Sequence, residues 1–151
     1  MLRDRIAEAQ KEAMKARDER KVSTLRMVNA AIKNADIAAR GDGKEAPNEA
    51  ELMSLLQKMI KQRQESSEMY EKGGRPELAA QEKQEIEIIS GFLPQPMSDA
   101  EAGVAIAAIL KEINAQSMKD MGRAMAELRG RFAGRMDFGK ASAKLKELLG
   151  K

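Results

Sequence analysis

The chain has 151 residues, a length that favours one domain. It contains neither cysteine nor histidine, which excludes disulfides, thiolate metal sites and the commonest general base of enzymes. The net charge is +3, and from Lys119 onward nine Lys and Arg stand against four Asp and Glu. The basic excess therefore lies near the carboxyl terminus, where either contact with a phosphate backbone or simple solvation would explain it.

The composition predicts an all-α fold, because aromatic residues make up only 3% of the chain and helix-favouring residues dominate. No apolar run approaches the roughly 20 residues of a membrane-spanning helix. The amino terminus is charged from its first turn and lacks the apolar region of a signal peptide. We therefore expect a cytoplasmic protein without a membrane span.

The spacing of apolar residues predicts four helices in the first part of the chain. The first two precede a glycine-rich surface loop at residues 41–47. Asn48 and Glu51 form a capping box that starts the third helix, and Pro76 suits the first turn of the fourth. The third and fourth helices should form an antiparallel hairpin about Gly74.

That hairpin places Arg63 beside Glu85 and close to Glu82, on faces that are otherwise apolar. We predict a half-buried ion pair between Arg63 and Glu85 or Glu82 that crosses the hairpin. The alternative is that the two glutamates are a catalytic acid and base. The structural interpretation is favoured, because neither a nucleophile nor a set of metal ligands accompanies them.

A joint follows the fourth helix, because Pro94 and Pro96 prevent the helix from continuing. Ser98 and Glu101 then form a second capping box, so a new helix begins at once. We expect three parts: a four-helix module at residues 1–93, the Pro-containing joint at 94–98, and a three-helix bundle at 99–151.

The last module is predicted to contain helices that start near Asp99, Ser117 and Asp137. Gly122 lies near the apolar stripe of the middle helix, where a missing side chain would let another helix approach closely. Methionine, with 11 copies in the chain, is interpreted as filling the core.

The candidate RNA-binding residues are the cations of this last module: Lys119, Arg123, Arg129, Arg131, Arg135 and Lys140. In residues 128–135 three arginines alternate with two glycines, which permits a compact loop that approaches phosphates. The alternative is a helix end, where glycine stops the helix and arginine complements its dipole.

Several motifs occur in order along the chain: Ser-Thr-Leu-Arg at 23–26, Lys-Gln-Arg-Gln-Glu-Ser at 61–66, Gly-Arg-Pro-Glu-Leu at 74–78, Phe-Leu-Pro at 92–94, Asp-Met-Gly-Arg-Ala-Met at 120–125 and Gly-Arg-Met-Asp at 134–137. Together they resemble the GatB/YqeY family, specifically its stand-alone YqeY-type proteins, over the full length. The resemblance implies an all-helical fold of four amino-terminal and three carboxy-terminal helices.

The resemblance also implies a function. In the B subunit of the tRNA-dependent amidotransferases, a similar domain forms the carboxy-terminal tail and helps to hold the tRNA at its outer corner. We therefore expect a non-catalytic helical module that binds tRNA or another structured RNA, in company with an amidotransferase or an aminoacyl-tRNA synthetase. A helical protein-interaction adaptor is the alternative.

At the level of the family, the resemblance links the chain to carbon–nitrogen ligases that use glutamine as amide donor. The sequence offers no nucleotide loop, nucleophile or ammonia channel to support that activity alone. We expect no catalytic residue, cofactor or metal, and an enzyme is only a third possibility.

Overall fold

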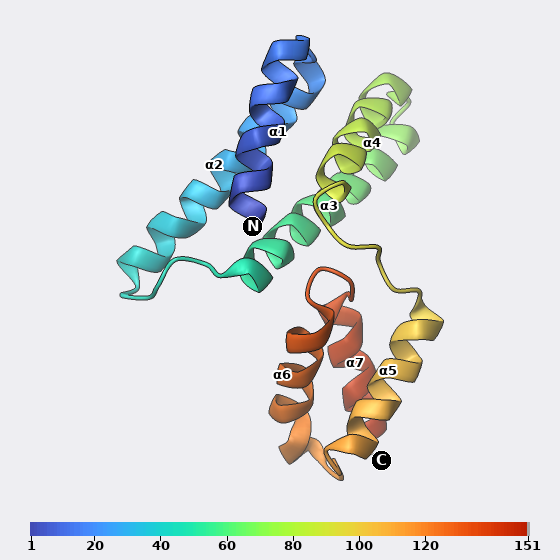
Figure 1. The fold of residues 1–151 in the computed structure, drawn as a ribbon. Helices are drawn as coiled ribbons and strands as arrows, with labels where there is room; N and C mark the ends of the chain where they lie inside the picture. Colours follow the sequence, from blue (N-terminus) through green and yellow to red (C-terminus); the bar gives the residue numbers. More distant parts are fainter. Residues whose placement is uncertain (151) are drawn as a thin grey trace. The chain divides into compact units, whose positions relative to one another are not determined.

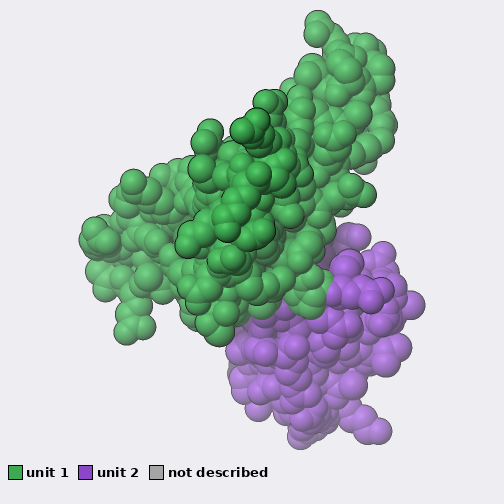
Figure 2. Space-filling model, turned by 45° about the horizontal axis from the view of Figure 1, so that its top comes forward, with its two compact units in different colours: residues 1–94 green, residues 95–151 purple. Residues whose placement is uncertain are grey.

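A computed structural model describes residues 1–150 of the chain. Over these residues it contains seven α-helices, one short 3-10 helix and no strand, so the predicted all-α fold is confirmed. The chain divides into two compact units, residues 1–94 and residues 95–151, which Figure 2 colours separately. Each unit has its own hydrophobic core.

The first unit contains four helices: α1 (Leu2–Ala16), α2 (Glu19–Gly41), α3 (Glu49–Lys72) and α4 (Pro76–Ser90). In Figure 1, α1 lies along the first part of α2, and α3 pairs with α4 in a hairpin. The turn between α1 and α2 is tight because Arg17 adopts the left-handed conformation, with φ of 56°, and Asp18 caps α2 by accepting from the backbone of Lys21.

The hairpin of α3 and α4 forms where local signals predict it. The Asn48 and Glu51 capping box starts α3, and Pro76 occupies the first turn of α4. Gly74 has a φ of 74°, a conformation that glycine adopts without strain. The core of the unit is made by apolar residues of all four helices and the segment that follows: Leu2, Ile6, Leu25, Val28, Ile32, Leu52, Leu56, Met59, Ile89 and Phe92.

The second unit contains three α-helices and a 3-10 turn: α5 (Asp99–Glu112), η1 (Met118–Asp120), α6 (Met121–Phe132) and α7 (Phe138–Leu149). The predicted capping box of Ser98 and Glu101 starts α5. The core of the second unit is formed by Ile106, Ile109, Ala124, Met125, Leu128, Met136, Ala141 and Leu145.

The prediction for Gly122 is wrong. This residue is exposed, and nothing lies within 4 Å of the position that its Cβ would take. A helix that starts near Ser117 would place Met118 in its apolar stripe, but Met118 belongs to the 3-10 turn and is 46% exposed. Because Met118 is not part of α6, the inner side of this helix is centred on Ala124 and Leu128, and Gly122 faces outward.

Glu85 of α4 is the electrostatic centre of the first unit. It is 5% exposed, and its Oε2 accepts a hydrogen bond of 3.0 Å from Nε of Arg63 on α3, which is the contact that the hairpin register predicts. Nη1 of Arg20 on α2 lies 3.9 Å from the Oε1 atom of Glu85, a contact that the sequence did not suggest. One buried carboxylate therefore joins three helices.

Glu82, the second predicted partner of Arg63, is half-buried one turn away on α4. Its pKa is raised, first by burial and then by the negative charge of Glu85, while the positive charge of Arg63 opposes the shift. The charged form of Glu82 is therefore disfavoured in the folded protein.

We expect Glu85→Gln to lower the free energy of unfolding by about 3 kcal/mol, because it leaves the buried guanidinium of Arg63 without its counter-charge. Urea denaturation of the intact protein measures this loss. The double variant Arg63→Met/Glu85→Met should lose less than Glu85→Gln alone. A cycle of single and double variants that shows no coupling would remove the structural role of the pair.

Glu82→Gln should raise stability near neutral pH. Because the folded-state pKa of Glu82 is raised, the folded protein binds its proton more tightly than the unfolded chain, so stability falls as pH rises from the ordinary carboxyl range through the folded pKa. The gain from Glu82→Gln should disappear below the ordinary carboxyl range, at about pH 4. Denaturant midpoints at both pH values test this, with the exposed Glu87→Gln of the same helix as control.

Candidate nucleic-acid interface

The six predicted RNA-binding cations all lie in the second unit. One is in η1, three are on α6, one is in the loop after α6 and one is in the first turn of α7: Lys119; Arg123, Arg129 and Arg131; Arg135; Lys140. Arg135 is half-buried and the other five are exposed.

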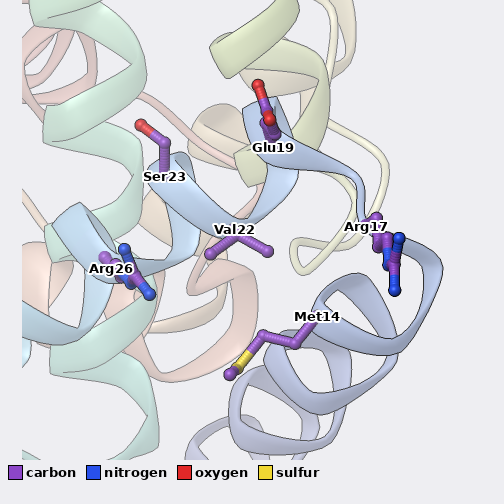
Figure 3. Close-up of a pocket in the computed structure, with 6 residues that line it drawn as sticks. All are labelled: Met14, Arg17, Glu19, Val22, Ser23 and Arg26. Atoms are coloured by element: carbon purple, nitrogen blue, oxygen red, sulfur yellow. The ribbon is translucent and has the colours of Figure 1, made fainter.

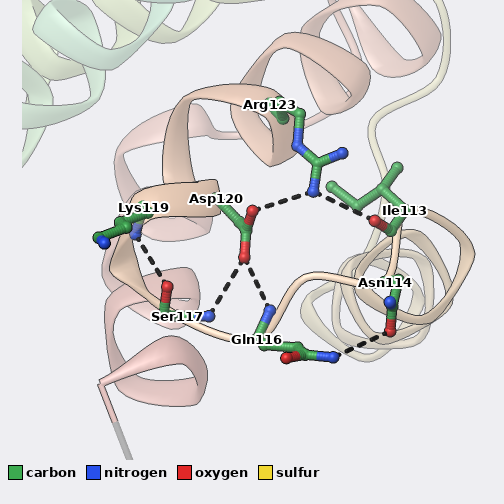
Figure 4. Close-up of polar contacts among 7 residues, drawn as sticks. All are labelled: Ile113, Asn114, Gln116, Ser117, Lys119, Asp120 and Arg123. Carbon is green, nitrogen blue, oxygen red and sulfur yellow. Dashed lines mark hydrogen bonds and ion pairs between the residues drawn. The ribbon is translucent and has the colours of Figure 1, made fainter.

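Arg123 holds the connection between α5 and α6 together. Its Nη2 atom donates to Asp120 at 2.9 Å and to the carbonyl oxygen of Ile113 at 3.2 Å (Figure 4). The other carboxylate oxygen of Asp120 accepts from the backbone of Gln116 at 2.8 Å and of Ser117 at 3.2 Å. These backbone hydrogen bonds, followed by the one from Arg123, lower the pKa of Asp120.

Three more of the six cations also have partners within the unit. Arg131 donates to both carboxylate oxygens of Glu112, at 2.7 and 2.9 Å, and to Glu127 at 3.1 Å. The arginine lowers the pKa of Glu112. Lys140 lies 3.6 Å from Asp99, and Nε of Arg135 donates to the carbonyl oxygen of Gln95 at 3.0 Å. Four of the six predicted cations therefore have partners within their own unit.

Lys119 and Arg129 have no carboxylate partner among residues 1–150. The side chain of Lys119 points away from Arg123, on the other side of the Ser117–Asp120 turn (Figure 4). The guanidinium of Arg129 lies 5.9 Å from the centroid of the Phe138 ring, which anchors α6 to α7 and leaves the charge at the surface.

The outer face of α6 has an unusual composition. Its exposed residues are three arginines and three small residues: Arg123, Arg129, Arg131, Gly122, Ala126 and Gly130. Arg123 and Arg129 flank Ala126 on either side, each about 60° around the helix. Nothing lies within 4 Å of a Cβ placed at Gly122 or Gly130. The result is a low, open surface between guanidinium groups.

Residues 128–135 form a helix end with a short loop. Helix α6 continues through Arg129, Gly130 and Arg131 to Phe132, and the chain turns at Gly134, whose φ is 79°. The compact loop that the glycines permit is therefore wrong for Gly130, which is helical. The physical reason is that Leu128 is fully buried and Phe132 packs on the core, so the helix continues to bury both.

The first unit has a surface hollow of about 290 Å³ at the corner between α1 and α2, which sequence reasoning missed (Figure 3). Its walls combine apolar and charged side chains: Met14, Arg17, Glu19, Val22, Ser23 and Arg26. Arg17 and Arg26 have no carboxylate partner within residues 1–150. The only signal in the sequence was the Ser-Thr-Leu-Arg motif, which ends at Arg26.

Among the described residues, no group of three or more Asp or Glu side chains is placed to hold a metal ion. The helices of residues 1–150 include none with the length and apolar character that a membrane crossing requires.

Comparison with known protein families gives a match to YqeY-like proteins that covers residues 3–149. The chain belongs to the YqeY-like family. The match extends over both units of this YqeY-like protein, so the resemblance stated from the motifs is confirmed.

Three fungal proteins are similar to this YqeY-like chain, and each is named altered inheritance of mitochondria protein 41, mitochondrial. The protein of Lachancea thermotolerans is 37% identical over 105 residues, which cover 68% of this chain and 54% of the relative. That of Candida glabrata is 36% identical over 92 residues, 60% and 50% of the two chains. That of Saccharomyces cerevisiae strain YJM789 is 35% identical over 85 residues, 56% and 44% of the two chains. The chain therefore spans about half the length of these relatives.

Asp120→Asn should destabilise the protein near neutral pH. The folded-state pKa of Asp120 is lowered, so its contribution to stability is present above the ordinary carboxyl range and is lost as pH falls through the folded pKa. The difference from the wild type should therefore shrink in acid. Thermal unfolding followed by circular dichroism at neutral and acidic pH measures it, with Glu147→Gln, an exposed acid of α7, as control. Equal stability of Asp120→Asn and wild type at neutral pH would contradict the argument.

Proposed function

We propose that this YqeY-like protein is a non-catalytic helical module that binds tRNA or another structured RNA through the outer face of α6. The observation that carries the proposal is the composition of that face, where the exposed residues are arginines and small residues and the one acid of the helix, Glu127, accepts a hydrogen bond from Arg131. Guanidinium groups form strong hydrogen bonds with phosphate oxygens, and the small residues between them let a sugar-phosphate backbone approach the helix. Lys119, in the turn before α6, and Lys140, in the first turn of α7, add two exposed cations to the same unit.

The ion pairs of the second unit are compatible with this role. The side chain of Lys140 is 69% exposed, and an isolated ion pair between exposed groups contributes only about 0–1 kcal/mol. A phosphate can therefore replace the carboxylate partner at small cost. Arg123, whose side chain is 60% exposed, can meet a phosphate while it keeps its bond to Ile113.

Folded RNA is favoured over single strands. Binding of unpaired bases generally uses exposed aromatic side chains on which the bases stack. None of the large exposed apolar residues within residues 1–150 is aromatic, and Phe132 and Phe138 pack on the core of the second unit. Contacts to the backbone and shape of a structured RNA fit these residues better.

The resemblance to the tail of the amidotransferase B subunit supports tRNA as the RNA. It also supports an amidotransferase or an aminoacyl-tRNA synthetase as the protein that meets this chain on the same tRNA. The YqeY-like family match and the similarity to fungal proteins support the fold of the module and leave its ligand to experiment.

We expect Lys119→Glu/Arg129→Glu to weaken binding to a tRNA transcript at least about tenfold. Because two phosphate contacts are lost, the slope of log affinity against log salt concentration should become shallower by about 2. Fluorescence anisotropy over a salt series measures both quantities, and thermal unfolding verifies the fold. The control Lys58→Glu/Lys61→Glu makes the same charge change at two exposed positions of α3. Wild-type affinity and slope in the α6 variant would overturn the proposal.

A further inference from the structure

Charge in the first unit is segregated between helices. Residues 1–96 contain 17 Lys and Arg and 17 Asp and Glu, so this part of the chain has no net excess. Nevertheless α2 holds five cations and two acids, whereas α4 holds one cation and four acids. A neutral unit therefore presents one basic helix, which the net charge conceals.

The cations of α2 form a row on its exposed side. Arg26, Lys33 and Arg40 are all exposed and follow one another at intervals of seven residues, which is nearly two helical turns. Their Cα atoms are thus about 10 Å apart along one face of the helix. Exposed Ala30 and Ile37 lie between them, and exposed Ser23 precedes Arg26 on the same side.

The acids of α2 leave this row unmatched. Asp36 interacts electrostatically with Arg40, but its two carboxylate oxygens already accept hydrogen bonds from Arg3, at 2.7 and 3.1 Å. Glu19 lies at the start of the helix, before the row begins. Within residues 1–150, neither Arg26 nor Lys33 has a carboxylate partner.

The hollow at the corner of α1 and α2 lengthens the row. Arg26 and Arg17 both contribute to its walls, together with the hydroxyl-bearing Ser23 (Figure 3). Glu19 also lines the hollow, so the cations outnumber the acid there by two to one. The positive side chains therefore continue past the beginning of α2 to the end of α1.

We propose that the face of α2 formed by Arg26, Lys33 and Arg40 is a second RNA-contacting surface, which binds the phosphate backbone. This inference rests on the proposed function and extends it to the first unit. The other helices of that unit mix exposed acids and cations, whereas α2 repeats the pattern of α6, with cations separated mainly by small residues.

A phosphate backbone suits this row better than a protein partner does. RNA carries negative charge continuously along its backbone, so a row of cations at regular intervals meets phosphates without a matched sequence. A protein helix docked on the same face would have to match each cation with an acid. It would also bury little apolar surface, since Ile37 is the one large exposed apolar side chain along the row, while the exposed Met27 lies about 100° away from Arg26 around the helix.

The experiment compares three double variants of the full chain: Arg26→Glu/Lys33→Glu on α2, Lys119→Glu/Arg129→Glu at α6, and the control Lys58→Glu/Lys61→Glu on α3. Each makes the same charge change. The probes are a tRNA transcript and a fully paired RNA hairpin, titrated over a salt series. We expect the α2 variant to bind at least about tenfold more weakly than wild type with a salt slope shallower by about 2, and the control to stay within about twofold. Thermal unfolding verifies that all three variants fold.

The outcomes separate this inference from the proposed function. If only the α6 variant loses affinity, the α2 surface is overturned and the proposed function stands. If only the α2 variant does, the α2 surface is supported and the α6 interface is wrong. Equal losses in the α2 variant and the control overturn the inference, because net charge alone then explains them. If the wild type binds neither RNA, both the α2 surface and the proposed function are overturned. If Arg26→Glu/Lys33→Glu binds RNA like the wild type but abolishes self-association in light scattering, RNA binding by α2 is overturned.

Discussion

The buried carboxylate of Glu85 is the constraint on which the first unit depends. A charge removed from water requires close partners, and Glu85 finds them in Arg63 of α3 and Arg20 of α2. Helix α2 must therefore pack with Arg20, and the buried residues that follow it on the same side, toward α4. This choice turns the opposite side of α2, with Arg26 and Lys33, toward solvent. The ion-pair cluster and the apolar residues Leu25, Val28 and Ile32 thus favour the same orientation of α2, and that orientation decides which of its residues form the surface.

In the second unit, the carboxylate of Asp120 likewise orients a helix through its hydrogen bonds. Its carboxylate accepts two backbone hydrogen bonds and one from Arg123, so it fixes the turn from which α6 begins. Because an α-helix keeps the phase in which it starts, this turn determines that Leu128 faces the core and Ala126 faces outward. Arg123 contributes both to that turn and to the outer face. The fold and the proposed interface therefore share a residue here.

Sequence reasoning succeeded where the signal is local. Capping boxes such as that of Asn48 and Glu51 involve residues three apart, and the hairpin register follows from a single turn at Gly74. It failed where tertiary packing decides. Arg20 reaches Glu85 across 65 positions of sequence, and Arg131 reaches Glu112 across 19, and no periodicity indicates either pair. The cations of the candidate site were identified from the sequence, but the acids that pair with them were not.

The comparison of the two units also shows why net charge is a poor guide to an interface. The last module was predicted to bind RNA because its cations outnumber its acids. Arg131 and Lys140 nevertheless form ion pairs with carboxylates of their own unit. The first module is balanced overall, yet α2 separates Arg26 and Lys33 from every acid that would neutralise them. A polyanion responds to the potential at the surface it touches, and that potential depends on which helix faces carry the charges. The row on α2 and the guanidinium groups of α6 therefore become visible only when each helix face is considered separately, in the basic unit and in the neutral unit alike.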